Sequence, residues 1–199
     1  MKILSFLVAT AITVTPVLAE ENRQLDAHEH GVGQLDMAFD GKQIAMELHA
    51  PGADIVGFEY EAESAPERAA VDAAVATLAG PLGLFVLPDA AGCSVVQATA
   101  GLESEEEHKD DDHVDDEHAD DNHAEAKHED HANEAGHTEF HAEYLLTCAD
   151  PTAINNINFS YFDSFPNALE VVVQVITAAG ATSFEVERDA PTLDLRGMF

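Results

Sequence analysis

A tract of acidic residues and histidines interrupts the chain between residues 103 and 136 and constrains how the rest can fold. It holds almost no aromatic or β-branched residue, so it cannot bury enough apolar surface to offset the entropy of ordering it. The flanking segments have about 80 and 60 residues, and each would form a marginal core alone. A linker between two domains is the alternative. We predict one domain over residues 20–199, with residues 103–136 as a disordered insertion.

The first 19 residues are typical of a secretory signal peptide. Lys2 precedes an apolar run over residues 3–14, and Val17 and Ala19 place small side chains three and one residues before a cut. The run is too short to span a bilayer, and no later stretch reaches the roughly 18 apolar residues that a membrane helix needs. A buried first helix is the alternative. We predict a signal peptide over residues 1–19, a periplasmic location and no membrane span.

The formal net charge of the chain is −31, which limits its partners. Removal of residues 1–19 takes away one lysine and no acid, so the charge becomes −32. Nucleic acids and anionic membrane surfaces are polyanions and would repel such a protein. We therefore expect no nucleic-acid partner, and we expect the protein to attract cations.

Alternation of apolar and polar residues predicts six strands arranged as hairpins. Asp40-Gly41 separates the first two strands, and Asp-Gly favours a type I′ hairpin turn because both central residues need positive φ. A capping-box sequence, Ser64-Ala65-Pro66-Glu67, opens an amphipathic helix that Gly80-Pro81 ends. The predicted strands are residues 32–39, 43–50, 93–102, 138–147, 168–177 and 182–188. The expected fold is α+β, an antiparallel sheet built from hairpins with one main helix and the acidic insertion at a hairpin tip.

The two cysteines, Cys93 and Cys148, are expected to form a disulfide. If the strands around the insertion pair as a hairpin, Cys93 lies opposite Cys148 and Gly101 lies opposite Phe140. Opposed residues on antiparallel strands have Cα atoms about 4.5 to 5.5 Å apart, within disulfide range. A Cys2His2 zinc site is the competitor, but its cysteines normally stand two to four residues apart.

Histidines recur at intervals of five residues in the acidic tract, with carboxylates in most gaps. They are His108, His113, His118, His123 and His128, followed by His131. Five residues turn a helix by about 500° and change the face of a strand, so the spacing builds no prearranged face. It suits a flexible chain that folds several imidazoles around one ion. A solvated acidic spacer with incidental histidines is the alternative.

Two shorter histidine groups lie on segments that we expect to be ordered. His28 and His30 are two residues apart, so on an extended segment they point to one side. His137, Glu139 and His141 likewise share one face of a predicted strand. If the N-terminal segment lies beside this strand, the four histidines and the glutamate can converge on one ion. Exposed surface histidines are the alternative for each pair.

Zinc suits these ligands because it accepts imidazole nitrogen and carboxylate oxygen with little geometric preference of its own. Magnesium and calcium prefer shells made only of oxygen, which leaves the histidines unexplained. Copper(II) and nickel remain alternatives, since copper binds imidazole sites more tightly in the ordinary affinity order. His49 stands alone near a strand end and is expected to be structural or exposed. We therefore predict a zinc-binding protein.

No sequence signature of catalysis accompanies the histidines. A hydrolytic zinc site would show a pattern such as His-Glu-x-x-His, and the chain contains none. It also lacks a Gly-rich phosphate loop and a nucleophile elbow. We therefore expect no enzymatic activity. A metal-dependent hydrolase and a purely structural or surface-interaction protein remain the competing functions.

Several short motifs resemble those of one known family. They are His28-Glu29-His30-Gly31, Gly57-Phe58-Glu59, Gly92-Cys93, the run from His137 to Tyr144, Cys148-Ala149-Asp150-Pro151, Phe165-Pro166 and Val172-Val173-Gln174-Val175. The chain resembles the ZrgA-like zinc-regulated periplasmic proteins of proteobacteria over nearly its whole length after residue 19. The family motifs fall on His28, His30 and Gly31, and on His137, Phe140 and Tyr144.

This resemblance implies a periplasmic zinc-binding protein in zinc acquisition, which collects zinc for an ABC-type uptake system or hands zinc to it. The implied partners are an ABC transporter permease or another zinc-binding periplasmic protein. Zinc storage, buffering or sensing is the alternative role, because the resemblance does not decide between delivery, storage and sensing.

Overall fold

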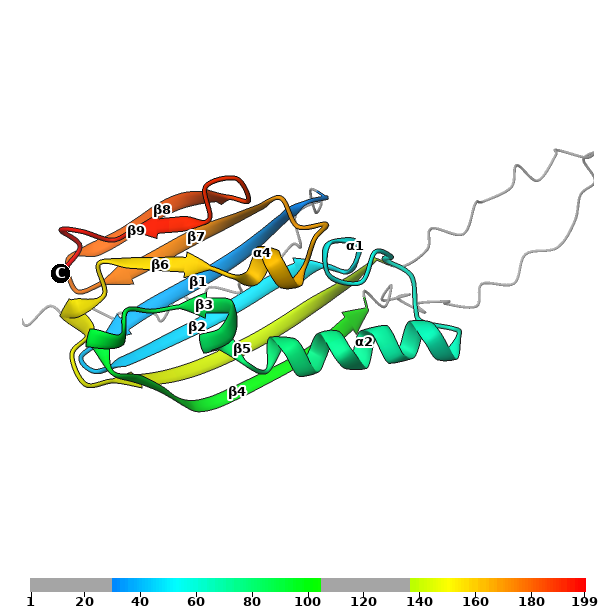
Figure 1. Ribbon diagram of the computed structural model, residues 1–199, viewed down its shortest axis with the longest axis horizontal. Helices are drawn as coiled ribbons and strands as arrows, with labels where there is room; N and C mark the ends of the chain where they lie inside the picture. Colours follow the sequence, from blue (N-terminus) through cyan, green and yellow to red (C-terminus); the bar gives the residue numbers. More distant parts are fainter. Residues whose placement is uncertain (1–29, 105–136) are drawn as a thin grey trace, which may run out of the picture.

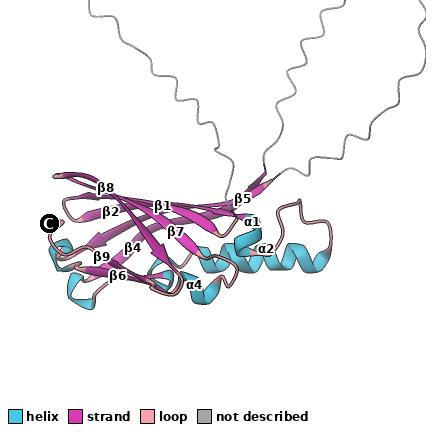
Figure 2. Ribbon diagram, turned by 90° about the horizontal axis from the view of Figure 1, so that it is seen from above, coloured by secondary structure: helices cyan, strands magenta, loops and turns pink. Residues whose placement is uncertain are grey.

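The computed structural model describes residues 30–104 and 137–199 of the chain. The predicted signal peptide, residues 1–19, and all but the first two residues of the predicted insertion, residues 103–136, lie outside the described residues. The described part forms a six-stranded sheet, and a small second sheet and several helices cover one of its faces (Figures 1 and 2). It is mostly β-structure with a few short helices.

The large sheet consists of three hairpins side by side, in the strand order β4-β5-β2-β1-β7-β8 (Figure 1). Its strands are β1 (Val32–Asp40), β2 (Gln43–Pro51), β4 (Cys93–Ser104), β5 (Thr138–Cys148), β7 (Glu170–Thr177) and β8 (Gly180–Glu187). All six predicted strands are thus confirmed within a few residues of their ends. Strand β4 continues through Glu103 and Ser104, two residues into the segment that the sequence assigns to the insertion.

One strand pair departs from the expected antiparallel sheet. The middle hairpin, β1–β2, pairs antiparallel with β5 on one side, but it pairs parallel with β7 on the other. A parallel pair requires a connection that crosses from one end of the sheet to the other. Residues 149–169 provide this crossing, because they carry β6 and α4 over the covered face before β7 begins (Figure 1). The sheet is therefore mixed.

The first hairpin forms as the alternation predicts, with a shifted turn. Its two-residue connection is Gly41-Lys42, because Asp40 pairs with Gln43. Gly41 has a φ of 58°, the left-handed conformation that such a turn requires. On the strands themselves the apolar set points to the covered face, where Leu35 and Leu48 are fully buried.

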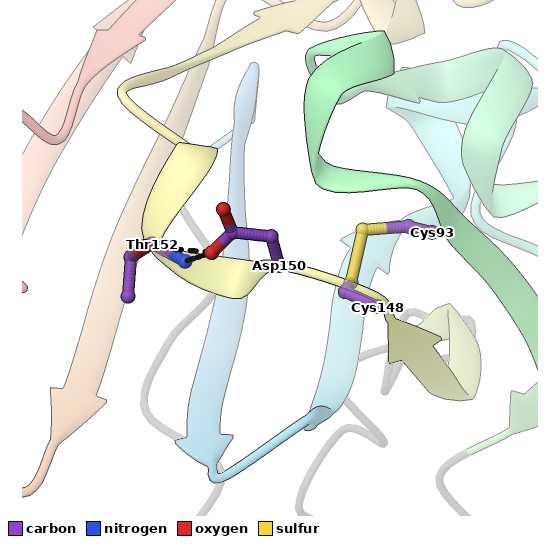
Figure 3. The surroundings of a disulfide bond; sticks show 4 residues. All are labelled: Cys93, Cys148, Asp150 and Thr152. Atoms are coloured by element: carbon purple, nitrogen blue, oxygen red, sulfur yellow. Dashed lines mark hydrogen bonds between the residues drawn. A yellow bond between two sulfur atoms is a disulfide. The ribbon is translucent and has the colours of Figure 1, made fainter.

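A disulfide joins Cys93 to Cys148, as predicted, at the base of the β4–β5 hairpin (Figure 3). The predicted partner of Gly101 is wrong by one residue, because Gly101 lies opposite His141 instead of Phe140. The register shifts between Val95 and Gln97, where a β-bulge places one extra residue, Val96, in β4. Beyond the bulge every residue of β4 faces a partner one position further along β5.

The main helix, α2 (Ala65–Leu78), begins at the predicted capping box. Ser64 Oγ accepts a hydrogen bond from the Glu67 amide at 3.2 Å, and the Glu67 carboxylate accepts one from the Ser64 amide at 2.7 Å. The helix packs along β4 and buries Ala74 and Leu78. It ends before Gly80-Pro81, also as predicted.

The second sheet and the remaining short helices have no counterpart in the sequence-based prediction. They are β3 (Phe85–Val86), β6 (Asn156–Phe159), β9 (Thr192–Asp194), α1 (Gly52–Ile55), α3 (Pro81–Leu84), α4 (Tyr161–Ser164), η1 (Asp89–Ala91) and η2 (Pro151–Ala153). Their aromatic side chains close the core: Phe85 packs edge-on against Phe159 at 5.3 Å between ring centroids and stacks over Tyr161 at 6.0 Å. The described residues contain no helix that is both long and apolar enough to cross a membrane.

Candidate metal site

The face of the large sheet that the helices leave open carries a group of histidines and carboxylates. Side chains two residues apart on a strand share a face, so Glu47 and His49 of β2 lie on the same side, as do Glu139 and His141 of β5. Strand pairing places His49 directly opposite His141. Figure 2 shows the large sheet edge-on, with helices and the second sheet on one side only. The group therefore lies on the side away from the core.

Three of these side chains are close enough to hold one ion. Glu47, His49 and His141 each offer a ligand atom, and these atoms all lie within 4.8 Å of one another. Nε2 of His49 is 3.2 Å from a carboxylate oxygen of Glu47. With bonds of 2.0 to 2.1 Å, the ligand atoms of a tetrahedral zinc ion are about 3.3 Å apart. Small side-chain rotations therefore suffice to form a two-histidine, one-carboxylate site with a fourth position open.

Glu139 contacts the other nitrogen of the same imidazole. Its Oε2 atom lies 3.4 Å from Nδ1 of His49, so a proton on Nδ1 is donated to this carboxylate. A histidine that binds metal through one nitrogen usually donates the other N–H to such a carboxylate, which fixes the ring and makes it a better ligand. Glu139 is thus placed to orient His49, whose other nitrogen, Nε2, contacts Glu47.

The carboxylates also raise the pKa of His49 above its ordinary value of 6.5. The hydrogen bond to Glu139 is the largest cause, and Glu47 adds to it, while partial burial opposes both. In the metal-free protein both nitrogens face a carboxylate, which favours the doubly protonated ring. A metal ion would replace the proton on Nε2, so ion and proton compete for the same position.

The site is open to solvent along β4. His141 lies opposite Gly101, and nothing stands within 4 Å of the position that a side chain at Gly101 would take. A shallow groove runs here, lined by Thr99, Ala100, Gly101, Glu103, His141 and Glu143. An ion can therefore reach His141 without any movement of the strands.

The structure divides the predicted ligands into two groups. Glu139 and His141 join the group on the open face, whereas His30 and His137 both contact Glu59 near the start of β5. The predicted convergence of these histidines on one ion is therefore not what the described residues show. The remaining predicted ligands, His28, His108, His113, His118, His123, His128 and His131, lie outside the described residues.

Two residues of the open-face group were missed by the sequence-based prediction. The sequence predicts that His49 is structural or exposed, and it indicates no role for Glu47. Their spacing of two residues on a predicted strand was a usable signal, because it places both on one face. What the sequence did not show is that β2 pairs with β5, which alone brings His49 to His141.

Residues 27–195 match a family of known proteins, described as the ZrgA family zinc uptake protein. The match spans nearly all of the described residues, including both strands that carry the open-face group. A comparison with curated proteins finds no match.

Proposed function

The chain belongs to the ZrgA family of zinc uptake proteins, and we propose that it is a non-enzymatic, periplasmic zinc-binding protein that serves zinc acquisition. The observation that carries the proposal is the group of Glu47, His49 and His141, whose ligand atoms lie within 4.8 Å of one another on an open sheet face. Two imidazoles and one carboxylate form a ligand set that zinc accepts readily. Copper(II) and nickel are the competing ions.

The position of the group supports binding and release better than catalysis. Zinc hydrolases also use three protein ligands and an open position, and they hold their substrate in a concave, mostly apolar pocket. A hollow of about 420 Å³ does lie on this face and is lined by Glu47, Asp36 and Glu143 among others, but neither His49 nor His141 lines it. Here the ligands lie on the outer face of a sheet, and the side chains of Glu47 and His49 remain 33% and 23% exposed. A partner protein could approach the ion directly, as a protein that hands over its metal requires.

We propose that the acidic tract acts as a looser collector that supplies this site. Residues 105–137 connect Ser104 to Thr138, which pair with each other at the end of the β4–β5 hairpin. His141 is three residues from this junction. Ions that exchange rapidly among the tract histidines would therefore be concentrated near the open-face group. The acceptor would be an ABC-type zinc uptake system, reached through its permease or another zinc-binding periplasmic protein.

Isothermal titration with zinc tests this function on four forms of the protein. The unaltered chain should bind several ions, a chain without residues 105–136 should keep the tighter ones, and a chain with His49→Gln and His141→Gln should lose one tight ion. Glu143→Gln is the matched control, because Glu143 lies on the same face of β5 but outside the close group. Zinc binding that is unchanged by the paired histidine substitutions would refute the open-face site.

Measuring zinc transfer to an acceptor protein distinguishes a zinc-delivery function from a zinc-storage function. Zinc-loaded protein is mixed with a zinc-free solute-binding protein of an ABC-type zinc transporter, and the appearance of loaded acceptor is followed over time. Delivery predicts transfer that is faster than spontaneous release into a chelator. Transfer at the rate of spontaneous release would instead favour storage or buffering.

A further inference from the structure

A second group of histidines and carboxylates lies at the end of the sheet where β1 and β5 begin. Glu59 is at its centre: its Oε2 atom is 3.1 Å from Nε2 of His30 and 2.9 Å from Nδ1 of His137. These residues come from three distant parts of the chain. Such a convergence of two imidazoles on one carboxylate oxygen is the first of three observations that identify the site.

The second observation is a buried carboxylate beside this group. Asp54 of α1 is only 2% exposed, and one of its oxygens accepts a hydrogen bond from the Gly31 amide at 2.8 Å. Burial raises the pKa of Asp54, and the charges of His30 and Glu59 also act on it. The charges of His30 and Glu59 therefore reach Asp54.

The third observation is that three oxygen atoms in this region are buried without a hydrogen-bond partner. Among the described residues, the second oxygen of Asp54, Oε1 of Glu59 and Oγ1 of Thr138 are buried without any partner. A buried carboxylate oxygen without a partner destabilises the fold, since the group has lost the water that would otherwise hydrogen-bond to it. A cation between these oxygens would offset that cost.

The backbone holds the group in place. The Thr138 amide donates to the carbonyl of Glu59 at 3.0 Å, which fixes Glu59 beside His137. Gly52 lets α1 approach β5, because a Cβ atom there would lie 2.5 Å from Thr138 Oγ1 and 2.7 Å from the carbonyl oxygen of Phe58.

The amides of Leu169 and Glu170 both donate to the carbonyl of Gly31 at 2.8 Å, which anchors the residue next to His30. The ligands are therefore set by tertiary contacts.

We propose that His30, Asp54, Glu59 and His137 form a second divalent-metal site, which takes zinc in a shell of two imidazoles and two carboxylates. The separations of 2.9 and 3.1 Å between imidazole nitrogens and Glu59 are near the 3.3 Å or so that separates ligand atoms around tetrahedral zinc. The imidazoles are 68% and 61% exposed. They can therefore turn toward an ion that enters from solvent, and the site requires this, because among the described residues only the open-face group has three ligand atoms within 4.8 Å of one another.

This site is separate from the open-face group and goes beyond the function proposed above. His137 directly precedes β5 and is four residues from His141, which corresponds to about 13 Å along an extended chain. One ion cannot bind both. Because its ligands come from residue 30, α1, the loop after α1 and the start of β5, the second site would also tie these segments together when it is loaded.

The test is to count tightly held zinc ions on the full chain in competition with a chromophoric chelator, together with the melting temperature at saturating zinc. Glu59→Gln and His137→Gln should each lose one tight ion and much of the zinc-induced rise in melting temperature. Glu61→Gln is the matched control, because Glu61 is an exposed carboxylate in the same loop. Because the side chain of His137 is largely exposed, His137→Gln should leave the fold intact, so a lost zinc ion in this variant is not explained by misfolding.

The two sites can fail independently. A variant with His49→Gln and His141→Gln should lose the zinc ion of the open-face site. A variant that also carries Glu59→Gln should lose two tight zinc ions. If Glu59→Gln and His137→Gln both keep the zinc count and the thermal response of Glu61→Gln, the second site is overturned, whatever the open-face variants do. If only the open-face variants keep their zinc, the second site stands and the proposed function loses its basis.

Discussion

His49 and His141 face each other across the ladder between β2 and β5, with their ring centroids 3.7 Å apart and their planes almost perpendicular. Both rings depend on the register of this ladder, because a slip of one residue would turn either side chain to the opposite face. The residues that flank them on the same strands, Leu48 and Phe140, are fully buried and fix that register. The hydrophobic core thereby sets the position of the ligands.

We predict that Glu139→Gln lowers the zinc affinity of the open-face site by 10- to 100-fold, in line with the usual cost of losing a carboxylate that supports a metal-binding histidine. The amide keeps the size of the side chain but cannot stabilise the Nδ1 proton of His49 as a carboxylate does. Competition titration against a zinc chelator measures the change. An affinity equal to that of Glu143→Gln would contradict the orienting role of Glu139.

We predict that His49 in the metal-free protein titrates above 6.5 and that Glu139→Gln brings its pKa back toward that value. The folded-state pKa is raised above the unfolded one, so the protonated ring stabilises the fold fully at pH values below 6.5. That contribution disappears as the pH rises through the folded-state pKa. NMR titration of the histidine ring measures the pKa, and urea unfolding in the presence of a chelator measures the stability. A His49 pKa at or below 6.5 in the unaltered protein would refute this prediction.

We predict that Gly52→Ala destabilises the protein by about 1 to 3 kcal/mol, the usual cost of forcing an extra carbon into a packed site. The new Cβ atom would meet Thr138 Oγ1 at 2.5 Å and the Phe58 carbonyl oxygen at 2.7 Å. Gly83→Ala is the control, since nothing lies within 4 Å of its added carbon. Urea unfolding of both variants decides; equal stabilities would show that α1 can move away from β5 at little cost.

We predict that Cys93→Ser combined with Cys148→Ser costs about 2 to 4 kcal/mol of stability, because the disulfide closes a long loop in the unfolded chain. Zinc affinity should change little, since Cys148 is seven residues beyond His141, roughly 24 Å along β5. Denaturant unfolding and zinc titration of the same variant test both statements. Finding two free thiols in the unreduced, unaltered protein would show that the Cys93–Cys148 disulfide does not form.

The hairpins and the main helix were predictable because their signals are local. Each of the six long strands has eight to twelve residues, enough for a pattern of apolar residues to show, and Ser64 with Glu67 marks the start of α2. Strands β3, β6 and β9 have two to four residues, too few to show a period. The parallel pairing of β1 with β7 joins segments far apart in the sequence and has no local mark at all.

The residues of the candidate sites also divide into those with a local sequence signal and those without one. His30, His137, Glu139 and His141 stand in histidine motifs that the sequence displays openly. Glu47 and His49 look like the ordinary polar face of a strand until β5 is placed beside them. Asp54 and Glu59 belong to a four-residue helix and the loop after it, where no periodicity indicates which carboxylate is turned inward.

The position of the middle hairpin, β1–β2, affects the order in which the chain folds. This hairpin has a tight turn and can form within microseconds, but both its edges must wait for partners made later: β5 for one edge and β7 for the other. Until β7 arrives, the edge of β1 offers unpaired amides and carbonyls to any extended segment nearby. A chain cut or stalled before Glu170 would keep that edge open, and such fragments should associate with one another instead of remaining monomeric.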